Sequence, residues 1–128
     1  MSERYLLDAS AVLAVAGDEP GAAVVTGRPG RAVMSAVNVA EVYARLLRAG
    51  VSHAEIDLGV SSLVAEVIAF DRPQAEAAAA LHARTRHLGL SLADVACLAL
   101  GAALGLPVLT ADREWAKVEG VGLVEVIR

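Results

Sequence analysis

Short apolar segments alternate with longer helical segments along the whole chain, and this alternation restricts the possible fold more than any other feature. The predicted strands are residues 5–7, 32–35, 67–70, 108–109 and 123–127. The predicted helices are residues 9–16, 21–26, 37–49, 53–65, 73–88, 92–104 and 113–118. Strands separated by helices are typical of a parallel sheet covered on both faces. We therefore predict an α/β fold with three layers, α/β/α, around a mostly parallel sheet of four to five strands.

The length and composition of the chain favour a single domain. The 128 residues contain 56% apolar residues, which is enough for a packed core, and no repeat or linker divides residues 1–128. The longest uncharged segment, residues 95–111, contains Gly105 and Pro107 and does not predict a membrane span. The sequence also shows no secretory leader pattern. We expect a soluble protein of the cytoplasm with no membrane partner.

Four acidic residues follow predicted strands or lie on helices beside them: Asp8, Glu41, Asp94 and Asp112. A parallel sheet brings such positions to one edge, where ligands of open α/β folds bind. Carboxylates held close together repel one another or take up protons unless a cation joins them. Mg²⁺ is a hard ion that prefers carboxylate oxygens and water, and Mn²⁺ is a possible substitute. The four acids therefore predict a divalent metal site.

The charge of the chain is consistent with this interpretation. A net charge of -4 is unusual for a protein that binds nucleic acid, because phosphates favour a basic surface. When the four candidate acids are set aside, 11 of the 15 acidic residues remain against 11 basic ones. The excess negative charge is therefore the charge of the predicted site itself.

Three of the acids are also candidates for helix capping, an interpretation that the sequence leaves open. Asp8 directly precedes the first predicted helix and is a candidate N-cap, and Ser10 is placed to hydrogen-bond it. Asp94 stands in a Ser91-x-x-Asp94 pattern, which is typical of a capping box. Asp112 is placed to cap the short helix that contains Trp115, a residue that we expect to pack in the core.

Glu41 belongs to a polar stripe on its predicted helix. Asn38, Glu41, Arg45 and Arg48 recur at helical spacing opposite an apolar face. The structural interpretation is a solvated face with an ion pair between Glu41 and Arg45. In the functional interpretation the stripe lines a cleft, with Glu41 toward a metal and Asn38, Arg45 or Arg48 toward phosphate. Thr110, at the end of a strand, is a candidate to bind a ligand, a water or the following helix start.

These segments, taken in order, resemble those of the PIN-domain ribonucleases, and among them the small VapC-type toxins of toxin–antitoxin pairs. The matching segments are residues 6–11, 35–41, 90–94 and 109–115, and together they span most of the chain. The resemblance implies a PIN-like domain that cleaves RNA endonucleolytically with a divalent metal. It also implies a homodimer and an antitoxin protein that occupies the active-site groove.

With this resemblance, each residue has an expected role. Asp8, Asp94 and Asp112 would bind Mg²⁺, and Glu41 would orient or deprotonate the attacking water. The expected substrate-positioning residues are Ser10, Asn38, Arg45 and Thr110. A ligand role for Glu114 is left open, because the family carries a further acid or Asn near this position in some members.

Two other classes of function remain as alternatives. One is a phosphoryl-transfer domain of the receiver or phosphatase type, for which Asp71 follows a predicted strand. This alternative lacks the Asp-x-Asp pattern of an aspartyl phosphatase, because the chain has Ser10 two residues after Asp8. The other is a PIN-like module that binds RNA or protein without catalysis, although such a module gains nothing from clustered carboxylates facing phosphate.

Overall fold

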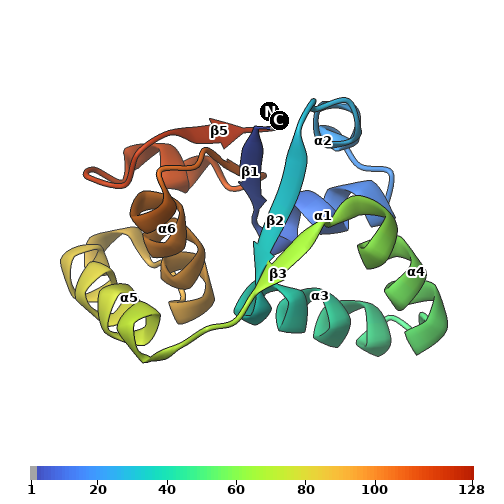
Figure 1. The fold of residues 1–128 in the computed structure, drawn as a ribbon, viewed down its shortest axis with the longest axis horizontal. Coiled ribbons are helices and arrows are strands. Elements are labelled where there is room, and N and C mark those ends of the chain that lie inside the picture. Colours follow the sequence, from blue (N-terminus) through green and yellow to red (C-terminus); the bar gives the residue numbers. More distant parts are fainter. Residues whose placement is uncertain (1–2) are drawn as a thin grey trace.

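A computed structural model describes residues 3–128 and shows one five-stranded sheet in which every strand pair is parallel (Figure 1). The strands are β1 (Arg4–Leu7), β2 (Arg31–Ser35), β3 (Glu66–Ile68), β4 (Val108–Thr110) and β5 (Val124–Val126). Their order across the sheet is β3-β2-β1-β4-β5. The predicted α/β class is confirmed, with an entirely parallel sheet.

Helices cover both faces of this sheet. The α-helices are α1 (Ala9–Ala16), α2 (Ala22–Thr26), α3 (Ala36–Arg48), α4 (His53–Leu63), α5 (Arg72–Arg84) and α6 (Leu92–Leu104), and the 3-10 helices are η1 (Arg86–Leu88) and η2 (Arg113–Lys117). Figure 1 shows α1 to α4 on one side of the sheet and α5 and α6 on the other. Within the described residues, no helix is both long and apolar enough to span a bilayer.

The core consists of two apolar clusters that the sheet separates. Tyr5 and Leu7 of β1 point into the cluster formed with α1 to α4, whereas Leu6 points into the cluster formed with α5 and α6. This alternation follows from the two-residue period of a strand, and both faces are apolar because both are covered. Trp115 is fully buried in the second cluster, as expected from the sequence.

The predicted boundaries differ from the structure mainly around α5. The predicted helix 73–88 is divided at Thr85, whose hydroxyl donates to the carbonyl of Leu81 at 2.8 Å and competes with the helical hydrogen-bond pattern. The preceding strand β3 ends at Ile68, which pairs with Ser35 at the end of β2. The residues that follow contact α5, because Gln74 donates to the carbonyl of Ala69 and Asp71 caps the helix. The backbone at residues 69–71 therefore belongs to the helix entry.

The strand order reverses between β1 and β4, and this reversal determines where a site can form. The connection from β1 to β2 passes through α1 and α2 on one face, whereas the connection from β3 to β4 passes through α5 and α6 on the other. Chains that leave neighbouring strands toward opposite faces open a crevice at the carboxyl ends of those strands. The amide of Asp8 donates to the carbonyl of Leu109 at 3.0 Å at this position.

Candidate active site

A cavity of about 310 Å³ lies at the carboxyl edge of the sheet, and all four predicted acids line it. Its other lining residues are Ala9, Ser10, Leu13, Ala44, Arg45 and Arg48. The acids come from four separate segments: the end of β1, the middle of α3, the start of α6 and the loop after β4. The topology therefore brings together residues that are up to about a hundred positions apart in sequence.

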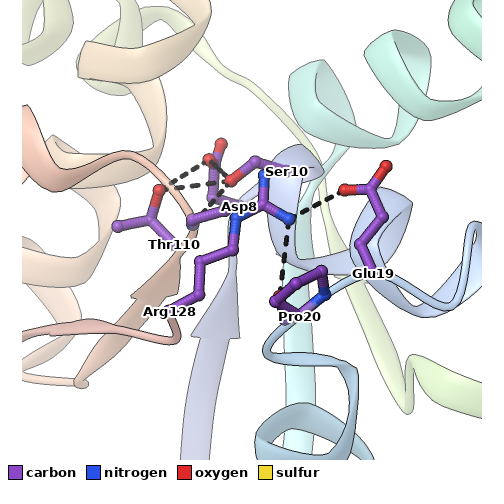
Figure 2. A network of polar contacts seen from close by, with 7 residues as sticks. Asp8, Ser10, Glu19, Pro20, Thr110 and Arg128 are labelled. Atoms are coloured by element: carbon purple, nitrogen blue, oxygen red, sulfur yellow. Dashed lines mark hydrogen bonds and ion pairs between the residues drawn. The ribbon is translucent and has the colours of Figure 1, made fainter.

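Asp8 is the most buried of these acids, with only 4% of its surface exposed. Ser10 Oγ donates to Asp8 Oδ2 at 2.6 Å, and Thr110 Oγ1 donates to the same oxygen at 3.0 Å, as Figure 2 shows. Although Asp8 precedes α1, its side chain makes no capping hydrogen bond, so the N-cap interpretation is wrong. Neither hydrogen bond uses Oδ1, which remains available for another partner.

The environment of Asp8 favours its protonated form. Burial, as the main cause, raises the pKa of this carboxyl from 3.8 to about 6. The hydrogen bonds from Ser10 and Thr110 lower the pKa, whereas the nearby charges of Asp94 and Glu41 raise it. A carboxylate in this position is therefore costly for the apoprotein near neutral pH, and a cation beside it would remove that cost.

The hydroxyls of Ser10 and Thr110 each donate one hydrogen bond and accept another. Ser10 Oγ accepts from the amide of Ala111 at 2.9 Å, and Thr110 Oγ1 accepts from the amide of Asp112 at 3.1 Å. Each hydroxyl has one hydrogen to donate, and both hydrogens point to Asp8. The two residues therefore connect β1 to the loop after β4 and hold Asp8, and the contact from Ser10 is the one expected from the sequence.

Glu41 is held by a neighbour on its own helix. Asn38 Nδ2 donates to Glu41 Oε1 at 2.9 Å, and no ion pair forms between Glu41 and Arg45 within residues 3–128. Asn38 is fully buried and does not line the cavity, so it lies outside the polar stripe that the sequence predicts. Arg45 and Arg48 are exposed and do line the cavity.

Asp94 and Asp112 cap helices, as the sequence predicts. The Ser91 amide donates to Asp94 Oδ2 at 2.9 Å, and Ser91 Oγ accepts from the Asp94 amide at 3.1 Å, which completes a capping box. Asp112 Oδ1 accepts from the amide of Glu114 at 3.0 Å at the start of η2. Each carboxylate keeps a second oxygen outside its cap, so the capping role and a place in the cavity are compatible.

Two other acids named from the sequence lie away from the cavity. Glu114 forms an ion pair with Lys117 at 3.1 Å and is absent from the cavity lining. Asp71 accepts from the amide of Gln74 at 3.1 Å as the N-cap of α5, so the acid that a phosphoryl-transfer domain would need is outside this site.

The chemistry of the cavity fits a hard divalent cation. Its charged residues are four carboxylates and two guanidinium groups. Within residues 3–128, no three His, Cys, Asp or Glu side chains converge closely enough to hold a metal ion by themselves. Mg²⁺ commonly binds through one or two carboxylates and keeps several waters, so a loose group of oxygen donors suits it better than a complete protein cage.

Cys97 lies beneath this site, which the sequence analysis did not predict. Complete burial, as the main cause, and the charges of Asp8, Asp94 and Glu41 raise the pKa of its thiol well above the ordinary value. The available signal was its spacing, because Cys97 follows Asp94 by about one helical turn on α6. The thiol is therefore kept in its neutral form close to the acids, although it does not line the cavity.

The comparisons with known proteins assign the chain to one family. The PIN domain family model matches residues 5–121, and the chain therefore belongs to the PIN domain family. No curated protein sequence matches the chain.

Solved structures with the same fold include several toxin–antitoxin complexes. A toxin–antitoxin complex from Klebsiella pneumoniae matches with a TM-score of 0.76 at 18% identity, covering 97% of this chain and 98% of the other. VapBC2 from Rickettsia felis, bound to a DNA fragment from its promoter, matches with a TM-score of 0.72 at 12% identity, covering 98% and 99%. VapBC-5 from Mycobacterium tuberculosis matches with a TM-score of 0.59 at 24% identity, covering 98% of each chain.

Proposed function

We propose that this protein is a metal-dependent endoribonuclease that hydrolyses RNA phosphodiester bonds and acts as the toxin of a type II toxin–antitoxin pair. The observation that carries the proposal is the common cavity of Asp8, Glu41, Asp94 and Asp112, beside Arg45 and Arg48. Carboxylates on one side and guanidinium groups on the other suit a metal-bound phosphate better than a neutral ligand.

Asp8, Asp94 and Asp112 would hold Mg²⁺ or Mn²⁺, directly or through water. The bound cation would supply a more acidic water and neutralise charge that develops on the phosphate. Ser10 and Thr110 keep Asp8 oriented, because their hydroxyls both donate to its Oδ2. This leaves Asp8 Oδ1 as the oxygen of that residue without a hydrogen bond among the described residues.

Glu41 would orient the attacking water and accept its proton. The carboxylate is partly exposed, lines the cavity and is held through Oε1 alone, so Oε2 remains for water. Arg45 and Arg48 follow it on the same helix and line the same cavity. Their planar, permanently charged groups suit the phosphates on either side of the cleaved bond.

An antitoxin is the proposed protein partner, and the solved toxin–antitoxin complexes with this fold support it. A second cavity of about 520 Å³ lies between α1, α3 and α4 and is lined mainly by apolar side chains such as Val12, Leu46, Ile56 and Leu63. Residues of α1 and α3 line both cavities. A segment of the antitoxin that fills the apolar cavity would therefore lie close enough to cover the acidic cavity as well. A homodimer is the proposed assembly of the toxin.

The proposed activity is tested by incubating the purified protein with single-stranded RNA in the presence of Mg²⁺, Mn²⁺ or excess EDTA. We expect endonucleolytic fragments with either cation and none with EDTA. The Asp94→Asn variant controls for contaminating ribonuclease, because it removes the charge while the side-chain oxygen of an Asn can still accept from the Ser91 amide. Cleavage that persists in EDTA, or that is equal in the variant, would exclude the proposed site as its source.

A further inference from the structure

The side-chain amide of Asn38 connects the two helices that carry Glu41 and Asp94. Asn38 lies in the first turn of α3 and is fully buried. Its Nδ2 donates to Glu41 Oε1 at 2.9 Å and to the carbonyl of Ala93, in the first turn of α6, at 3.2 Å. Both partners accept hydrogen bonds only, so the nitrogen, and not the oxygen, of the amide must face them.

Packing alone does not explain an asparagine at this position. Its Oδ1 is buried and has no hydrogen-bond partner among the described residues. A buried acceptor without a partner is destabilising, and an apolar side chain of similar size would avoid that loss. The feature that an apolar side chain would not provide is the pair of donated hydrogen bonds.

The hydrogen bond to Glu41 opposes a repulsion within the site. Glu41 lines the same cavity as Asp8 and Asp94, so its carboxylate shares that space with like charges. A glutamate side chain has several rotamers, and repulsion would favour those that point away from the other acids. A charge-assisted hydrogen bond from a buried, immobile amide selects one of them.

We propose that Asn38 is a positioning residue, which fixes the carboxylate of Glu41 relative to the start of α6 and so to Asp94. This inference rests on the proposed nuclease function, in which Glu41 orients the attacking water. Asn38 itself touches neither substrate nor metal, because it is fully buried and outside the cavity lining. This role of Asn38 differs from the phosphate contact that the sequence predicted for it.

The proposal predicts a specific kinetic change in Asn38→Val. We expect kcat to fall by about 10- to 100-fold, because a misplaced general base loses most of its contribution. KM and the Kd for Mn²⁺, measured by calorimetry, should change by less than about twofold, since Arg45 and the three aspartates are untouched. Asn38→Asp, which keeps the shape and places a second carboxylate against Glu41, should lower kcat at least as much.

A double-mutant cycle separates positioning from a general loss of structure. In the Glu41→Gln background, Asn38→Val should lower kcat by less than about twofold, because the residue it acts through is already inactive. Thr85→Val is the matched control: it removes another buried side-chain hydrogen bond, to the Leu81 carbonyl, at the C-terminal end of α5. The control should melt no higher than wild type and retain its kcat.

The outcomes distinguish this inference from the proposed function. A wild-type protein without metal-dependent cleavage contradicts the function, and the Asn38 contact is then read from the NMR signals of its side-chain amide. Slow hydrogen exchange of these protons, with a shift of their signals in Glu41→Gln, would support the contact. Three results would each overturn the positioning role. They are an unchanged kcat in Asn38→Val, full additivity in the double-mutant cycle, and Asn38 side-chain amide signals that do not shift in Glu41→Gln.

Discussion

The four acids of the candidate site form two pairs that the protein holds in different ways. The rim pair, Asp94 and Asp112, accept hydrogen bonds from backbone amides at the starts of α6 and η2. The inner pair, Asp8 and Glu41, accept only from side chains: two hydroxyls in one case and the Asn38 amide in the other. The rim pair therefore belongs to the secondary structure, and the inner pair does not.

This difference separates acids that stabilise the fold from acids that the fold has to accommodate. A carboxylate at a helix start is favourable, because it satisfies free amides and faces the positive end of the helix. Asp8 has no such benefit, and its burial raises its pKa to about 6. Replacing an inner residue should therefore damage activity without damaging the fold, whereas replacing a rim residue should affect both.

The largest expected effect is the loss of RNA cleavage in the Asp8→Asn variant. The amide keeps the shape of Asp8 and an oxygen that accepts from Ser10 and Thr110, but it loses the charge that would hold a cation. We expect RNA cleavage to fall by at least about 10³-fold.

The same variant should be more stable than wild type at pH 7 by on the order of 1–3 kcal/mol, because it buries no charge. A denaturant unfolding curve at pH 7 measures this gain, and a variant that is both active and less stable would contradict the comparison.

The next effect is on the pH dependence of stability. The folded-state pKa of Asp8, about 6, lies above the ordinary 3.8, so its contribution to stability is complete below pH 3.8 and is lost as the pH rises through about 6. Between pH 5 and pH 7.5, ionisation of Asp8 should therefore lower the free energy of unfolding of the wild-type protein by about 1–2 kcal/mol. Asp8→Asn should not show this loss.

Urea unfolding at the two pH values measures this difference, and a divalent cation provides a second comparison. Mg²⁺ should stabilise wild type more at pH 7.5 than at pH 5, since it competes with the proton for the same carboxylate. Equal stabilisation at both pH values, or in Asp8→Asn, would place the bound cation elsewhere.

A smaller effect is expected at the rim. Asp94→Ala removes half of the capping box with Ser91 and should destabilise the protein by about 1 kcal/mol, whereas Asp94→Asn should cost less than half of that. Thermal melting of the two variants side by side measures the difference. Equal melting temperatures would show that the cap contributes nothing, and the distinction between rim and inner pair would then fail.

Much of the fold was predictable because its signals are local. The helix at residues 92–104 has its cap at Ser91 and its stop at Gly105, whose φ of 67° suits glycine, and the structure places α6 at the predicted bounds. The break at Thr85 was not predictable, since a threonine hydroxyl that bonds its own helix has no distinct sequence pattern.

The candidate site was predictable as a set of residues but not as a set of contacts. A parallel sheet gathers the ends of its strands, so the position of Asp8 after β1 and of Asp112 after β4 was sufficient to bring them to one edge. The direction of each hydrogen bond depends on packing between segments far apart in sequence. For this reason the sequence did not predict that Thr110 donates to Asp8 and Asn38 to Glu41.

The smallest expected effect concerns the cations beside the inner pair. Arg45 and Arg48 line the cavity from the exposed side of α3, so they would contact phosphates without touching the metal. Replacing either with Ala should lower kcat/KM by about three- to tenfold at low salt and leave kcat nearly unchanged. Each loss of a phosphate contact should also reduce the slope of log kcat/KM against log salt by about one. Arg72→Ala, which removes an exposed arginine paired with Glu76 on α5, is the matched control and should leave the slope unchanged. If Arg45→Ala, Arg48→Ala and Arg72→Ala all show the same salt slope, the guanidinium groups at the cavity do not bind the RNA backbone. Substrate binding would then depend on the acids and their cation alone.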